Sequence, residues 1–196
     1  LGVALKGALA VGAVEATAQN AEAALATGPR NVAVLLLTFP GDSAEPWSVA
    51  ETRSKVFTAA NSADAFYREE SYGEISLTGK LDEDGDVFGW LSLDTPTAGC
   101  PFNTWRDEAD EAAAGAGIDL TGYHHLVYMF PYQSSCSWAG TAGNDWSMIN
   151  GNWGTQVIVH ELGHNLGLLH AGSWTCTAAG VRVQISDTCT TSEYGD

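Results

Sequence analysis

Residues 160–170 read HELGHNLGLLH, and no other stretch of the chain says as much about its fold and chemistry. His160 and His164 are four residues apart, so on a helix their imidazoles share one face and can bind a single metal ion. Glu161 directly follows the first histidine, where a carboxylate can reach a water molecule beside that metal. The spacing therefore predicts a helix that carries a metal site and a general base.

A third histidine follows this predicted helix. Gly167 can adopt the left-handed conformation that ends a helix, which lets the chain turn back and bring His170 to the same ion. Three neutral imidazoles leave the fourth tetrahedral position of Zn²⁺ open to water, as in catalytic rather than structural zinc sites. The alternative is an ordinary amphipathic helix with solvated histidines. The metal site is favoured because three of the five histidines fall within this short stretch.

The composition fits one globular domain. The chain has 196 residues, of which 45% are hydrophobic and 16% charged, so it can bury a sizeable core. A net charge of −16 disfavours nucleic acid and anionic membranes as partners. No run of residues is long and apolar enough for membrane insertion. The oligomeric state is not encoded in these patterns.

The four cysteines allow three pairings. We expect two disulfides in a secreted, extracellular protein, with Cys100 bonded to Cys136 and Cys176 bonded to Cys189. The second bond would close a short loop just beyond His170. Free buried thiols are the alternative.

The N-terminal residues 1–30 are rich in alanine and end in Gly-Pro-Arg. We expect this segment to be a leader, either the end of a pro-segment or the remnant of a signal peptide. A plain amphipathic leader is equally compatible with its composition. The compact domain is predicted to span residues 31–196.

Several local patterns predict secondary structure around the motif. Residues 31–39 form an uninterrupted apolar run, which indicates a buried central strand. Ser48 and Glu51 have the spacing of a capping box that opens a helix through about residue 61. Residues 104–114 are helical by propensity, and residues 124–131 read as another buried strand.

An acidic turn is predicted between two strands. Apolar and polar residues alternate along residues 74–79, and residues 87–93 are largely apolar. We expect these two segments to pair as a hairpin across residues 82–86. Asp82, Asp84 and Asp86 lie at alternate positions of that turn, which suits a hard cation such as Ca²⁺. A solvated β-turn without metal is the alternative.

A candidate peptide-binding strand precedes the motif. Residues 138–142 could form an exposed edge strand, and such a strand can hold a substrate backbone by pairing with it. Its candidate substrate-binding residues are Trp138, Ala139, Gly140 and Thr141. A structural loop pinned by a disulfide is the alternative.

The extended pattern His-Glu-x-x-His-x-x-Gly-x-x-His resembles that of the metzincin zinc endopeptidases. Five stretches resemble the gametolysin-like branch in order along residues 30–196: VAVLLLTF, AFYREESYGEISLTG, DVFGW, CSWAG and HELGHNLGLLHA. This resemblance implies an α+β, zincin-like fold. It would consist of a twisted mixed β-sheet with a backing helix, an active-site helix beneath it, and a substrate cleft between them.

The chain departs from the metzincin pattern in one respect. Metzincins place a methionine in a tight turn downstream of the third histidine, whereas Met129 and Met148 both lie upstream of the motif. We expect the Met-turn and the C-terminal part of the catalytic domain to lie beyond Asp196. The alternative is a domain that lacks this turn.

The motif predicts zinc-activated water, and the resemblance to the gametolysin-like metzincins implies a zinc metalloendopeptidase. It would hydrolyse internal peptide bonds of extracellular or cell-wall proteins with a metal-activated water, and Glu161 would be the general base. One alternative is a non-catalytic, zinc-stabilised secreted binding or adhesion module, and another is hydrolysis of a different amide in a cell-wall polymer. Glu161 argues against the binding module, because zinc binding alone needs no carboxylate at that position.

Overall fold

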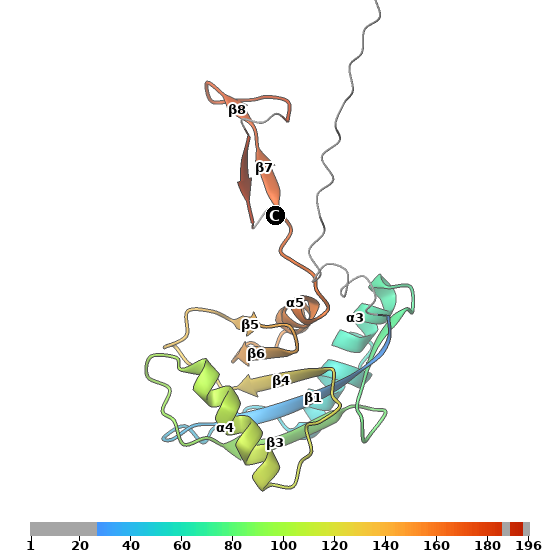
Figure 1. Cartoon of the computed structure of the whole chain (residues 1–196), viewed down its shortest axis with the longest axis vertical. Helices are drawn as coiled ribbons and strands as arrows, with labels where there is room; N and C mark the ends of the chain where they lie inside the picture. The colour runs from blue at the N-terminus through green and yellow to red at the C-terminus, as the bar shows by residue number, and fades with distance from the viewer. Residues whose placement is uncertain (1–26, 186–188, 194–196) are drawn as a thin grey trace, which may run out of the picture.

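A computed structural model describes residues 27–185 and 189–193 of the chain (Figure 1). The described elements, in chain order, are β1 (Gly28–Thr38), α2 (Val49–Arg53), the π-helix η1 (Ser54–Thr58), α3 (Ala63–Glu70), β2 (Ile75–Thr78), β3 (Asp86–Ser92), α4 (Phe102–Gly115), β4 (His125–Phe130), β5 (Gly140–Ala142), β6 (Trp146–Asn150), α5 (Thr155–Asn165), β7 (Ser173–Thr175), β8 (Thr177–Ala178), β9 (Val181–Arg182) and β10 (Thr190–Ser192).

The main sheet is mixed and mostly parallel. Its strand order is β2-β1-β4-β6-β5, and β3 also pairs with β1. All pairs are parallel except that of β5 with β6, which is antiparallel and places β5 at one edge. A mixed sheet and an edge strand just before the motif helix were both expected, although β5 is shorter than the predicted residues 138–142.

Strand β1 is buried on both faces, which explains its uninterrupted apolar sequence. Its even-numbered apolar residues from Val32 to Leu36 join a core cluster with Tyr67 of α3 and Leu162 of α5. The odd-numbered residues from Ala33 to Leu37 join a second cluster around Trp105 of α4. Adjacent strand residues point to opposite faces, so α4 covers one face of the sheet and α3 and α5 cover the other. Helix α4 crosses in front of the strands in Figure 1.

The expected hairpin of residues 74–79 with 87–93 is wrong. Strands β2 and β3 both pair in parallel with β1, the first along Gly28–Asn31 and the second along Ala33–Thr38. The Asp86 carboxylate accepts backbone N–H groups from Lys80, Leu81 and Asp82 at 2.6, 2.8 and 3.1 Å. These bonds fold the intervening segment into a compact loop, so the chain resumes its original direction along the same edge of β1.

The helical segment after β1 begins as expected but is divided. Ser48 caps α2 and forms the complete capping box with Glu51. The helix predicted through about residue 61 ends at Thr58, because Ala59 is extended. The sequence also predicts a second helical stretch at residues 62–71, and this prediction is confirmed. A new helix, α3, then starts with Ser62 as its N-cap.

Both disulfides join the cysteines that the sequence analysis expected to pair. Cys100–Cys136 joins the segment before α4 to the segment after β4. Cys176–Cys189 lies in residues 173–185 and 189–192, here called the arm, which extends away from the sheet beyond α5 (Figure 1). In the part of the chain that the structure describes, no helix has the length and apolar character needed to cross a membrane.

The domain begins slightly earlier than expected. Gly28–Asn31 already pairs with β2, so Pro29 and Arg30 belong to the first strand and not to a leader. The rest of the expected leader, residues 1–26, lies outside the described residues.

Candidate metal centre and active site

Helix α5 ends in a turn that returns the chain toward its own metal-ligand face. Gly167 has φ +86°, the left-handed conformation expected of it. Its N–H donates to the His164 carbonyl, and the Leu168 N–H donates to the Gly163 carbonyl, both at 2.9 Å. These two bonds make a Schellman motif, which satisfies carbonyls of the last helical turn. The turn brings His170 back beside the helix.

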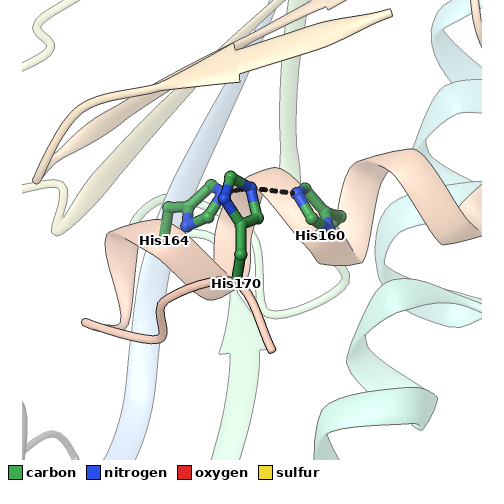
Figure 2. Close-up of side chains that lie close together, drawn as sticks. All are labelled: His160, His164 and His170. Atoms are coloured by element: carbon green, nitrogen blue, oxygen red, sulfur yellow. Dashed lines mark hydrogen bonds between the residues drawn. The ribbon is translucent and has the colours of Figure 1, made fainter. Parts of the chain in front are cut away.

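The three histidines converge on one point. The His170 Nε2 lies 3.2 Å from that of His164 and 3.1 Å from that of His160. Figure 2 shows the His170 ring between the other two. One ligand atom from each residue lies within 4.8 Å of the others. Tetrahedral zinc with Zn–N bonds of about 2.0–2.1 Å requires N···N separations of about 3.3 Å, close to the distances of 3.2 and 3.1 Å that His170 makes with the other two histidines.

Two of the imidazoles have a defined orientation. The His164 Nδ1 lies 2.9 Å from the Leu168 carbonyl oxygen, and the His170 Nδ1 lies 3.0 Å from the Glu193 Oε1. Carbonyl and carboxylate oxygens only accept hydrogen bonds, so each Nδ1 carries the proton and donates it. The Nε2 of each of these two rings then faces the common point, as a metal ligand requires.

Glu161 is buried beside the histidines, with only 5% of its surface exposed. Burial raises the pKa of its carboxyl group, while the positive charges of His164 and His170, when protonated, act in the opposite direction. A carboxylate in such a low-dielectric position is a stronger base than one in water.

The edge strand β5 passes directly over this carboxylate. A Cβ atom on Gly140 would lie 2.5 Å from both the Cγ and the Oε1 of Glu161, so any larger residue there would have to displace the Glu161 side chain. Of the other expected substrate-binding residues, Thr141 belongs to β5 and pairs with Met148. Trp138 and Ala139 precede the strand and line a separate hollow of about 610 Å³.

Two hydrogen-bonded side chains fix α5 in place, and neither was anticipated from the sequence. Asn165 Nδ2 donates to the carbonyls of Gly143 and Trp146, both at 2.8 Å, which ties the last helical turn to the β5–β6 connection. The Tyr67 hydroxyl donates to the Val159 carbonyl at 2.5 Å, which ties α3 to α5. A pattern search finds no signal for these bonds because the partners are main-chain carbonyls distant in sequence.

A groove of about 740 Å³ adjoins the metal ligands between α3 and α5. Its apolar lining includes Phe66, Val159, Leu168 and Leu169, and His160 and His164 form part of its wall. The groove can therefore accept an apolar group beside the metal centre.

The acidic turn uses its carboxylates for hydrogen bonds. Asp86 accepts three backbone N–H groups and also the Tyr123 hydroxyl at 2.6 Å, and Asp82 Oδ1 accepts the Asp84 N–H at 3.0 Å. Across residues 27–185 and 189–193, it is the histidine triad that forms a converging group of possible metal ligands, and the acidic turn does not. The structure therefore does not bring Asp82, Asp84 and Asp86 together as the expected calcium site.

The sequence matches the family model for gametolysin peptidase M11 over residues 47–178, a stretch that covers more than half of the chain and includes all three histidines. A search of curated proteins gives no match. The chain belongs to the gametolysin M11 family of metallopeptidases.

Proposed function

We propose that the protein is a zinc-dependent endopeptidase that hydrolyses internal peptide bonds of extracellular or cell-wall proteins. The observation that carries the proposal is the convergence of three imidazole nitrogens beside a buried carboxylate and an edge strand. The two disulfides support an extracellular location. The arrangement also supports a metzincin-like architecture, in which α5 is the active-site helix and α2 and α3 form the backing helix.

His160, His164 and His170 would hold the zinc ion through their Nε2 atoms. When bound, the ion supplies Lewis acidity: it lowers the pKa of a water ligand to about 7 and stabilises negative charge on the substrate oxygen. The chain's own contribution is a rigid ligand set, because α5 fixes two histidines and the Schellman turn returns the third.

Glu161 is the general base in this proposal. Its carboxylate accepts a proton from the attacking water and then donates that proton to the leaving amine. Its burial keeps the proton transfer away from bulk solvent and raises its basicity.

Strand β5 would bind the substrate backbone. It is the edge of the main sheet, so one row of its main-chain groups can pair with an extended peptide. Because Gly140 lies against Glu161, a peptide added to β5 would place a scissile bond close to the base.

The decisive test separates metal binding from catalysis. Glu161→Gln should bind one equivalent of zinc as tightly as the wild type and lower kcat on casein by about 10²–10⁴-fold. Glu111→Gln is the matched control, since it makes the same charge change on an exposed position of α4, across the sheet from α5. A Glu161→Gln variant with wild-type turnover would overturn the base assignment. A wild-type protein that binds zinc but cleaves no protein would point instead to a zinc-stabilised binding module.

A further inference from the structure

The arm returns the chain to the metal centre through a short ladder. Strand β7 pairs antiparallel with β10, with Ser173 opposite Ser192 and Thr175 opposite Thr190. In the same register, the next pair outward is Cys176 and Cys189, which form the disulfide. The next position inward sets Glu193 opposite Gly172, just beyond the loop that carries His170.

This register explains how Glu193 reaches a histidine 23 residues earlier in the chain. Because Gly172 is only two residues from His170, a side chain opposite Gly172 can reach the His170 ring. The Glu193 Oε1 lies 3.0 Å from the His170 Nδ1, on the side of the ring opposite to the ligand atom.

His164 and His170, the two candidate ligands whose Nδ1 partners are described above, are held in orientation by different kinds of partner. His164 donates to Leu168, four residues further on within its own helix-ending turn, so its support is local. His170 lies between α5 and β7 in neither helix nor strand, and its support comes from a distant carboxylate. A carboxylate on the outer nitrogen of a ligand histidine fixes the ring orientation and increases its basicity.

We infer that Glu193 is a positioning residue for His170, and that the Cys176–Cys189 disulfide holds the ladder that delivers it. The inference rests on the proposed zinc site. It goes beyond the family motif, because Glu193 lies outside the matched residues 47–178.

Exposed ion pairs often contribute nothing measurable, and the Glu193 side chain is 73% exposed, so the effect has to be measured on the metal itself. Zinc affinity of the full chain would be determined by competition with a chromophoric chelator. Glu193→Ala should weaken zinc binding by about 10- to 100-fold. Glu193→Gln should weaken it less, because the amide oxygen still accepts the hydrogen bond. Glu111→Gln is the charge-matched control and should bind zinc like the wild type.

Two further readouts separate positioning from general stability. The visible absorption spectrum of the Co²⁺-loaded protein should shift in Glu193→Ala, while the thermal unfolding of the metal-free variant should match the wild type. Replacing Cys176 and Cys189 together with serine should also weaken zinc binding, and adding Glu193→Ala to that variant should cause little further loss. Independent, additive losses would overturn the link between the disulfide and Glu193.

The outcomes distinguish this inference from the proposed function. Wild-type zinc affinity in Glu193→Ala would overturn the role of Glu193 and leave the peptidase proposal intact. A second outcome is that Glu193→Ala weakens zinc binding while the wild-type protein cleaves no protein substrate. This outcome would overturn the peptidase proposal and support the positioning role of Glu193. A wild-type chain with no zinc affinity would overturn both.

Discussion

Helix α5 and the arm both contribute to the candidate metal centre, but they are stabilised in different ways. The helix is part of the core, with Ile158 and Leu162 almost fully buried and Asn165 bonded to the sheet. The arm is exposed, including its large side chain Trp174 at 58%, and is held by its ladder and a disulfide. The three histidines of the candidate metal centre thus depend on two kinds of support, core packing at α5 and a disulfide-closed ladder beyond His170.

The largest expected effect in this comparison is on kcat and comes from a substitution beside the core helix α5. Gly140→Ala places a Cβ atom within 2.5 Å of the Glu161 carboxylate, which must move away from its position. Displacement of a reacting group by about 1 Å can lower kcat by about 10²-fold. Zinc content should not change, because no ligand is touched. Steady-state kinetics with metal analysis would test this, and undiminished turnover would show that β5 does not constrain the base.

The two disulfides allow the packed body and the arm to be compared directly. Loss of Cys100–Cys136 by double serine substitution should lower the free energy of unfolding by about 4 kcal/mol, because the bond closes a long loop between segments of the core. Loss of Cys176–Cys189 should leave the unfolding of the sheet nearly unchanged and weaken zinc binding instead. Denaturant unfolding and zinc titration of both variants would check this contrast, which disappears if both variants lose stability equally.

The stability of the packed body should also depend on pH. His125 is buried in β4, and neither ring nitrogen has a hydrogen-bond partner among the residues that the structure describes. Burial, together with the smaller effects of the Arg30 and His124 charges and against the opposing charge of Asp145, lowers its pKa from 6.5 to about 4.

The unfolded chain therefore binds a proton at His125 before the folded chain does as the pH falls. Its contribution to stability is complete above pH 6.5 and is lost between pH 6.5 and 4, by about 3 kcal/mol. Denaturant unfolding across this range would measure the slope, and His125→Phe should reduce it. An unchanged slope in His125→Phe would contradict the assignment.

The smallest expected effect lies at the junction between helix and arm. Gly167→Ala forces a left-handed conformation on a residue with a Cβ atom, which costs about 1–2 kcal/mol. The free energy of unfolding should fall by about that amount, and zinc affinity should fall with it if the turn shifts His170. Gly117→Ala, at a similar φ of +78° after α4, is the matched control and should lower stability without affecting zinc. Equal zinc affinity in both variants would show that the turn does not set the position of His170.

Sequence patterns predicted the elements that depend on nearby residues. The capping box of Ser48 and Glu51, the buried strand β1 and the helix-ending Gly167 are all confirmed. The hairpin between β2 and β3 was predicted wrongly, because strand periodicity identifies a strand without identifying its partner. The Asp86 side chain folded the intervening loop in a way that periodicity does not reveal.

The sequence by itself determined which residues form the candidate metal-ligand set. The four-residue spacing of His160 and His164 places them on one helical face, and Gly167 permits the turn toward His170, because both effects act over a single helical turn. Only the tertiary structure decided what surrounds those ligands. The contact of Gly140 with Glu161 and the bond of Glu193 to His170 join residues 21 and 23 positions apart. Such contacts depend on sheet order and strand register, and these are set by packing of the whole chain.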